Sequence, residues 1–287
     1  MRKFILLLLV SLVLTSCGEK FISSVDLGVE AKPVIGCFLV PGDTLISVSV
    51  TMSNLLYSRN PNVFKVRNDA VVRLLSNGQV LNLTYDTDRE KYVKLDSTFV
   101  VAGQNYRLEV ELDGLQHAAE TTVPQAYNDT ISLELIPVYR NWGTRTDTSY
   151  SFQKRWQAPA TGPYYFGSAI LVENYVNDTL ISIYPADDDG YSPIRLLLYS
   201  SSTPFRQFQR TSTRSFGSFR EANSKYRFTA ELLLTDLSFY RYSSSLEAHW
   251  YNAGEFFVEP SPVYSSFDNA LGVFGSFVRS RAYTPFF

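Results

Sequence analysis

Short runs in which apolar and polar residues alternate dominate the chain after residue 32, and this period of two is typical of β-strands with one buried face. In Asp43–Met52 (DTLISVSVTM), for example, a serine separates Val48 from Val50. The run Val34–Val40 before it is almost wholly apolar and is predicted to be the first strand. The strands predicted next are Ala70–Leu75, Val80–Tyr85, Tyr92–Leu95, Tyr106–Leu112 and Leu115–Val123.

Two connections in this part of the chain contain residues that favour tight hairpins. Asn77-Gly78 joins one pair of predicted strands, and Asp113-Gly114 joins another. Both dipeptides tolerate the positive φ angles that a two-residue hairpin turn requires. The strands also recur roughly every 8–12 residues, which is typical of β-sandwiches. We therefore expect residues 32–125 to form an N-terminal β-sandwich of the immunoglobulin-like or prealbumin-like kind.

After Pro124 the predicted strands are longer and more aromatic, so residues 126–287 are expected to form a second β-rich region. These strands are Thr130–Tyr139, Tyr150–Trp156, Tyr164–Tyr175, Leu180–Tyr184, Ile194–Tyr199, Tyr226–Leu234 and Leu271–Tyr283. One amphipathic helix is predicted near residues 236–251, because Asp236 can cap it and Gly254 can end it. Its apolar residues recur at spacings of three and four, at Phe239, Tyr242, Leu246 and Trp250. The expected fold class is mainly β with one helix.

The first residues have the order of a bacterial lipoprotein signal peptide. Arg2 and Lys3 precede the apolar stretch Phe4–Leu14, which is too short to span a bilayer. Leu14-Thr15-Ser16-Cys17 follows and resembles a lipobox. We expect residues 1–16 to be removed, Cys17 to be acylated, for example with palmitate, and residues 17–31 to be a tether. The alternative is an ordinary secretory signal that happens to contain a cysteine.

Composition excludes several classes of function. The 26 Lys and Arg residues are balanced by 28 Asp and Glu residues, for a net charge of −2, which argues against a general nucleic-acid binder. The chain has only two Cys and two His, so few side chains are available for catalysis by a thiol or an imidazole. Once Cys17 is acylated, Cys37 is the remaining thiol, and its apolar neighbours predict a buried core residue. His117 and His249 have no partner at metal-ligand spacing. We therefore expect no metal, no cofactor and no catalytic residues, and hence a protein that is not an enzyme.

A short motif, Asp followed by Thr or Ser and then an apolar or hydroxyl residue, recurs at predicted turns. It is explained by turn chemistry, because Asn, Asp and Gly make the turn and the next residues enter a strand. It also resembles the acceptor of protein O-glycosylation in Bacteroidetes. The candidate O-glycosylation sites are Thr44, Ser97, Thr130 and Thr179.

Aromatic residues are abundant, with 19 Tyr, 20 Phe and 3 Trp. Two clusters, Tyr164–Phe166 and Phe239–Tyr242, can form a platform on which a sugar or a partner protein stacks. Aromatic residues that alternate along strands are more often part of the core, and we expect most of these side chains to be buried.

The whole layout resembles a family of Bacteroidetes outer-membrane lipoproteins, domain of unknown function 4249. The similar segments are the lipobox Cys17, Asp69–Leu74 before Asn77-Gly78, Val101–Val110, Ala119–Pro124, Phe257–Pro260, Val263–Ser266 and Asn269–Gly275. The family more often has Asn and Gly where Ser266 and Ala270 stand. The resemblance implies a lipid-anchored protein of the outer membrane, facing the periplasm or the surface, often encoded beside a TonB-dependent outer-membrane receptor.

The sequence thus favours a lipid-anchored cell-envelope protein that acts as a non-enzymatic binding or accessory component, with a TonB-dependent transporter as the expected partner. The alternative is a surface glycan-binding or glycan-processing protein, in which exposed aromatic residues or a carboxylate pair do the work.

Overall fold

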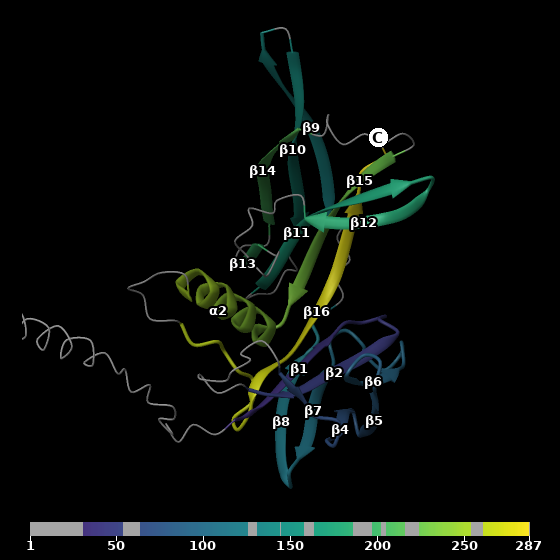
Figure 1. Ribbon diagram of the computed structural model, residues 1–287, viewed down its shortest axis with the longest axis vertical. Helices are drawn as coiled ribbons and strands as arrows, with labels where there is room; N and C mark the ends of the chain where they lie inside the picture. The colour runs from purple at the N-terminus through teal and green to yellow at the C-terminus, as the bar shows by residue number, and fades with distance from the viewer. Residues whose placement is uncertain are drawn as a thin grey trace, which may run out of the picture.

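The computed structural model describes residues 31–53, 64–125, 131–143, 145–157, 164–185, 197–201, 205–215, 224–253 and 261–286. The signal peptide, Cys17 and Thr130 lie outside these residues. The described chain is mainly β with one helix, which confirms the expected fold class. Figure 1 shows the first strands (purple to blue) at one end of the molecule and the longer later strands at the other.

The N-terminal strands form a sandwich whose layers belong to one continuous, folded-over sheet. Hydrogen-bonded neighbours follow the order β16-β1-β2-β6-β5-β4-β7-β8, and β3 pairs with β2. The strands are β1 (Pro33–Leu39), β2 (Leu45–Met52), β3 (Lys65–Val66), β4 (Val71–Ser76), β5 (Gln79–Asp86), β6 (Lys91–Leu95), β7 (Asn105–Leu112) and β8 (Leu115–Thr122). Burial alternates along β2, β4 and β7, as the period of two predicts.

Both predicted hairpin turns are present. Asn77 and Gly78 have φ angles of 50° and 76°, and Asp113 and Gly114 have φ angles of 53° and 76°. Positive φ at both central residues is the type I′ geometry, whose twist matches that of the flanking strands. The first turn joins β4 to β5, and the second joins β7 to β8.

The C-terminal region has two sheets and a helix. Its larger sheet continues the first through β16-β15-β11-β12, with β13 paired to β11, and a separate sheet has the order β14-β10-β9. The elements are β9 (Ser132–Trp142), β10 (Arg145–Gln157), β11 (Tyr164–Val176), β12 (Thr179–Pro185), β13 (Leu197–Ser201), β14 (Phe205–Ser215), β15 (Ser224–Thr235), α2 (Leu237–Ala253) and β16 (Leu271–Tyr283). The helix confirms the prediction near 236–251. β14 was not predicted.

β15 lies at the centre of this region and is buried on both faces. On one face, Leu232 and Leu234 pack with Trp156 of the smaller sheet and with Ile131, which directly precedes β9. On the other face, Leu233 packs with Phe239 of α2 and with β16. β15 is therefore the middle of three layers, which explains why its burial is almost continuous where that of β2 alternates.

One strand belongs to both regions. The first part of β16, Leu271–Ser276, runs parallel to β1, and the second part, Phe277–Tyr283, runs antiparallel to β15. Phe274 is fully buried in the core of the N-terminal sandwich, 149 residues after the predicted end of that domain at residue 125. A domain boundary at residue 125 stays a prediction, but the two regions share this strand (Figure 1).

Candidate functional site

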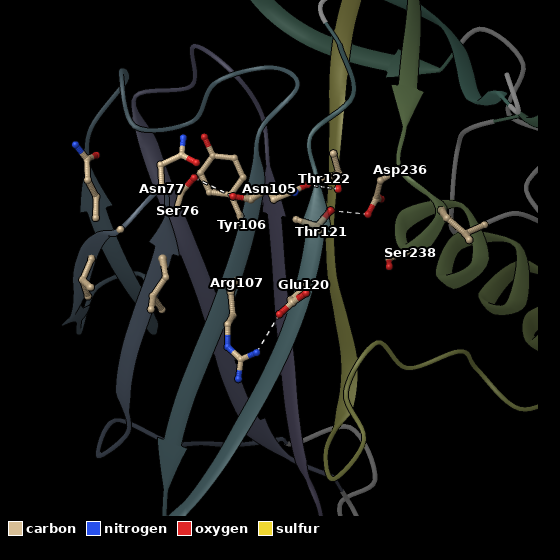
Figure 2. Close-up of a pocket in the computed structure, with 15 residues that line it drawn as sticks. Ser76, Asn77, Asn105, Tyr106, Arg107, Glu120, Thr121, Thr122, Asp236 and Ser238 are labelled. Carbon is tan, nitrogen blue, oxygen red and sulfur yellow. Dashed lines mark hydrogen bonds and ion pairs between the residues drawn. The ribbon is translucent and has the colours of Figure 1, made fainter. Parts of the chain in front are cut away.

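A groove of about 660 Å³ opens where the sandwich meets the start of α2. Three elements form it: the tip of the β4–β5 hairpin, the ends of β7 and β8, and the first turn of the helix (Figure 2). Most of its lining side chains are polar. The lining residues are Leu75, Ser76, Asn77, Gly78, Gln79, Val80, Asn105, Tyr106, Arg107, Glu120, Thr121, Thr122, Asp236, Leu237 and Ser238.

Hydrogen bonds between neighbouring strands hold the floor of the groove. The Ser76 hydroxyl donates to the Asn105 carbonyl at 2.8 Å, and the Thr122 hydroxyl donates to the Asn105 side-chain oxygen at 2.5 Å. Tyr106 lies below them, fully buried, and its hydroxyl donates to the Phe99 carbonyl at 2.8 Å. Because these groups already have partners, the groove is fixed in shape before any ligand enters.

Asp236 joins three elements at one wall of the groove. One oxygen accepts the hydroxyl of Thr121 on β8 at 2.5 Å, and the other accepts the amide of Phe239 at 2.8 Å and that of Ser276 on β16 at 3.2 Å. The predicted helix cap is thus present, and it also ties α2 to the sandwich. Burial raises the pKa of the Asp236 carboxyl, and the hydrogen bonds from Thr121, Phe239 and Ser276 oppose this effect without cancelling it.

The charges on the groove floor are paired. The Arg107 guanidinium lies 3.0 Å from a Glu109 oxygen and 2.9 Å from a Glu120 oxygen, and the pair on β7 and β8 is visible in Figure 2. These carboxylates raise the pKa of Arg107, so that it stays charged. The side chains of Arg107 and Glu120 are 46% and 70% exposed, so their pairing orients the two side chains rather than stabilising the fold.

The residues that remain able to bind a ligand are mostly neutral. Asn77, Gln79 and Asn105 supply amides, and Ser238 supplies a hydroxyl. Leu237 adds an apolar edge, with 38% of its surface exposed. Such a surface can donate and accept hydrogen bonds at several points without demanding a charged ligand.

The two aromatic clusters predicted as a platform meet beside the groove. The rings of Tyr165 on β11 and Tyr240 on α2 lie 4.8 Å apart between centroids, tilted by 38°. Both side chains are half-buried, whereas Phe239 is buried and contacts Phe38 and Phe277. The expectation of mostly buried side chains holds for Phe239, and the tyrosine pair retains an exposed part.

Three of the candidate O-glycosylation residues are exposed. Thr44 and Ser97 lie close together, because the amide of Asp96 donates to the Thr44 carbonyl at 3.0 Å. Thr179 follows the Asn177-Asp178 turn, where both residues have positive φ. These positions stay predictions, as does acylation of Cys17.

Cys37 is buried, as predicted, and burial raises the pKa of its thiol to about 12. His117 is also buried, and its Nδ1 has no hydrogen-bond partner. His249 Nδ1 lies 2.7 Å from the Ser261 carbonyl. Within the described ranges, no group of three or more His, Cys, Asp or Glu side chains is placed to hold a metal ion.

The sequence did not reveal the groove. Its residues come from a turn near residue 77, two strands near 105 and 120, and a helix start at 236, and no local motif joins them. The Asn-Gly turn and the helix cap were each recognised as structural signals. Only the folded-over sheet brings them together.

In the part of the chain that the structure describes, no helix is both long enough and apolar enough to cross a membrane. No functionally curated protein matches the chain significantly. A family model, domain of unknown function 4249, matches residues 22–282 and so covers both regions and the strand that they share. The chain belongs to this family of domain of unknown function 4249.

Proposed function

We propose that this protein is a lipid-anchored component of the cell envelope that binds a ligand in the groove beside α2. The observation that carries the proposal is the groove itself, in which amides and hydroxyls surround a space of about 660 Å³ whose floor is held by the hydrogen bonds of Ser76, Asn105 and Thr122. The lipobox at Cys17 supports anchoring in the outer membrane of a member of the Bacteroidetes, with residues 17–31 as the tether.

The role proposed for the groove is binding rather than catalysis. Both carboxylates that line the groove already have partners, since Asp236 caps α2 and Glu120 pairs with Arg107. A general acid or base needs a carboxyl that is free to exchange a proton with a substrate. The fixed partners of Asp236 and Glu120 fit a surface that orients a ligand.

The partner proposed for this protein is a TonB-dependent outer-membrane transporter, to which it acts as an accessory. The support is the resemblance of the chain to lipoproteins that are often encoded beside such receptors. A protein tethered to the same membrane by residues 17–31 stays within about 50 Å of its anchor, because an extended chain spans at most about 3.5 Å per residue. Tethering therefore raises its effective concentration at a neighbouring receptor.

Anchoring is tested by Cys17→Ala in the full-length chain expressed in its host. We expect loss of radioactive palmitate labelling and release from the membrane fraction. Labelling and membrane association that persist in the variant contradict the proposed lipid anchor. Cys37→Ala is the matched control, because it removes the other cysteine and leaves the lipobox intact.

Partnership is tested by cross-linking intact cells and purifying the tagged lipoprotein. Recovery of a TonB-dependent receptor, and its loss in the Cys17→Ala variant, are the expected results. If the acylated protein is recovered in quantity and no receptor accompanies it, the accessory role is wrong.

A further inference from the structure

We propose that the groove and the Tyr165–Tyr240 pair form one continuous site for a neutral oligosaccharide. This inference rests on the proposed function, in that the groove binds a ligand, and it names the chemical class of that ligand. Two observations carry it: the aromatic pair adjoins the groove, and the groove offers neutral hydrogen-bonding groups.

The backbone places the tyrosine pair directly beside the groove. Tyr165 is paired with Thr235 in the sheet, and the Thr235 hydroxyl donates to the Tyr165 carbonyl at 3.2 Å. The next two residues along the chain, Asp236 and Leu237, line the groove. Tyr240 follows Leu237 by three residues on α2, so their side chains are neighbours on the same side of the helix.

The surface from the groove to the tyrosines is therefore about one helical turn long, close to 5 Å. Leu237 lies between the two parts and is partly exposed. A ligand of several units can hydrogen-bond in the groove at one end and contact aromatic rings at the other. A ligand that fills only the groove would leave the tyrosine pair unused.

The tyrosine pair suits the apolar faces of sugar rings. Each ring has a flat apolar surface and a hydroxyl that can reach water. Contact between the two rings limits their motion, so little conformational entropy remains to be lost when a ligand stacks on them.

The charges around the groove disfavour an anionic ligand. Asp236 and Glu120 contribute two carboxylates, whereas Arg107 contributes one guanidinium that Glu109 also neutralises. A phosphate or an acidic saccharide would meet net negative charge at short range. Neutral hydroxyls instead match the amides of Asn77 and Gln79.

The sheet geometry favours a saccharide over an extended peptide. Peptides that add to a sheet bind through the backbone groups of an unpaired strand edge. The groove floor consists of side chains on the face of β7 and β8, whose backbones pair with each other along their whole length. β8 is the last strand of the sheet, but beside the groove its outer edge meets β16, where the Ser276 hydroxyl donates to the Thr122 carbonyl at 3.1 Å. Hydroxyl groups bind to such side chains directly, without needing a free strand edge.

The test measures binding to the purified full-length protein by isothermal titration calorimetry. The probes are cellohexaose, xylohexaose, mannohexaose and maltohexaose, with hexagalacturonate as the anionic comparison and an alternating glycine-serine hexapeptide as the peptide comparison. We expect saturable binding of at least one neutral hexasaccharide. Binding of none of the four, or stronger binding of hexagalacturonate or of the peptide, overturns the proposal.

Variants locate the site. Tyr240→Ala is expected to weaken binding of the hexasaccharide about tenfold, because it removes one ring of the pair. Tyr251→Ala is the matched control, since Tyr251 lies on the same helix and is 79% exposed. Equal affinities for both variants contradict the stacking role of Tyr240.

A second variant fills the groove without touching the core. Thr122 is exposed on β8, so Thr122→Trp is expected to abolish binding and leave the melting temperature nearly unchanged. Gln116→Trp is its control, because Gln116 is exposed on the same face of the same strand but does not line the groove. Unchanged hexasaccharide affinity in Thr122→Trp places the ligand elsewhere and overturns the proposal.

The outcome is separable from that of the proposed function. If palmitate labelling and receptor recovery succeed while every hexasaccharide fails to bind, the ligand class alone is wrong. If a hexasaccharide binds and the protein is neither acylated nor associated with a receptor, the anchored accessory role fails and the saccharide site stands.

Discussion

In the part of the chain that the structure describes, the N-terminal sandwich encloses one core, whereas the buried side chains of the C-terminal region form small clusters on the two sides of β15. Among the described residues, twenty buried side chains form the first cluster, and four or five form each of the others. The sandwich buries alternate residues between its two layers, and Phe267, Ala270 and Phe274 from the end of the chain complete its core. In the C-terminal region a central strand is covered on both faces, so its stability depends on how a second sheet and a helix pack onto it.

The two regions also differ in the partners of one arginine in each, Arg67 in the sandwich and Arg227 in the C-terminal region. Arg67 forms hydrogen bonds of 2.7–2.9 Å to Asp69 and Asp113, both of them exposed. Arg227 instead pairs with the buried Glu173 and lies 4.6 Å from the ring centroid of Tyr283 and 5.2 Å from that of Phe286. The first arrangement fixes a surface turn, and the second closes the chain end over the sheet. The carboxylates that pair with the arginine are thus exposed at Arg67 and buried at Arg227.

The strand shared by the two regions gives the largest predicted effect. Gly272 has a φ of 110°, and a Cβ at this position would lie 2.0 Å from the Ile35 carbonyl oxygen. Gly272→Ala is therefore expected to destabilise the protein by about 4 kcal/mol or more, because backbone must move and the parallel pairing of β1 and β16 is lost. Urea unfolding followed by circular dichroism measures the loss.

Gly42→Ala is the control for the shared strand. Gly42 also has a positive φ, of 81°, but no atom lies within 4 Å of the added carbon. We expect a cost of about 1 kcal/mol from backbone strain alone. If Gly272→Ala and Gly42→Ala lower the free energy of unfolding equally, the close approach of β16 to β1 contributes nothing to the cost of Gly272→Ala.

A truncation in the sandwich core tests whether the two regions unfold together. Leu108 is fully buried on β7, so Leu108→Ala is expected to cost about 2–5 kcal/mol. All three tryptophans lie in the C-terminal region, at positions 142, 156 and 250. Because β16 joins the regions, we expect tryptophan fluorescence to report the destabilisation at the same urea concentration as circular dichroism.

The control for Leu108→Ala is Leu115→Ala, since Leu115 lies in the same sandwich and is 64% exposed. Its cost is expected to be below about 0.5 kcal/mol. If fluorescence of Leu108→Ala keeps the wild-type midpoint while circular dichroism shows an earlier transition, the regions unfold independently.

The buried carboxylate of Glu173 in the C-terminal region predicts that the protein is less stable at acid pH. Burial disfavours ionisation of Glu173, but hydrogen bonds from Thr229, Tyr175 and Arg227 outweigh it and lower the pKa of the carboxyl. A lowered pKa stabilises the fold above the unfolded-state pKa, and this contribution is lost as the pH falls through the folded-state pKa. Glu173→Gln should cost about 2 kcal/mol at neutral pH and much less near pH 3, as measured by urea unfolding at both values.

Asp178→Asn serves as the exposed counterpart, because Asp178 pairs with Lys225 at the surface. We expect no measurable change in stability at either pH. A loss in Glu173→Gln that is the same at neutral and acid pH would attribute it to packing rather than to charge.

The smallest predicted effect concerns the carboxyl of Asp236, which lies between the two regions. Burial raises the pKa of Asp236, so its contribution to stability is fully present below the unfolded-state pKa and declines as the pH rises through the folded-state pKa. Asp236→Asn keeps a good helix cap and is expected to change stability by less than about 1 kcal/mol at neutral pH. Its stability relative to wild type should rise with pH, opposite in sign to the trend of Glu173→Gln.

Unfolding of Asp236→Asn at several pH values measures this trend. Asp236→Ala removes the cap as well and is expected to cost about 1 kcal/mol. A pH profile of Asp236→Asn that is parallel to that of wild type would show that Asp236 does not change its protonation on unfolding.

The sequence allowed most strands to be predicted because their burial has a simple cause. β2 and β7 have one buried face each, and their alternating residues show it. β16 was predicted over its full length from its apolar run, although its role in two regions was not. β14 was missed because residues 205–215 (FRQFQRTSTRS) have no apolar alternation, and the segment is a strand through its pairing with β10.

The site was predictable only in pieces. The platform of aromatic residues was proposed from two distant segments, and the structure brings Tyr165 and Tyr240 together. The groove was not predicted. In the sequence, Asn77 is an ordinary turn residue and Asn105 an ordinary strand residue, and only the folded-over sheet places both at the groove. Whether a polar residue faces a groove or open solvent depends on contacts that are remote in sequence.

By itself the sequence determined the fold class, the two type I′ hairpins, the helix with its Asp236 cap and the burial of Cys37, because each follows from local spacing or from the apolarity of near neighbours. The tertiary structure alone decided that β16 completes the N-terminal core, that β15 is covered on both faces, and that the groove opens beside a tyrosine pair. Period-two alternation specifies which residues face inward, but it does not specify which sheet, helix or strand lies opposite them.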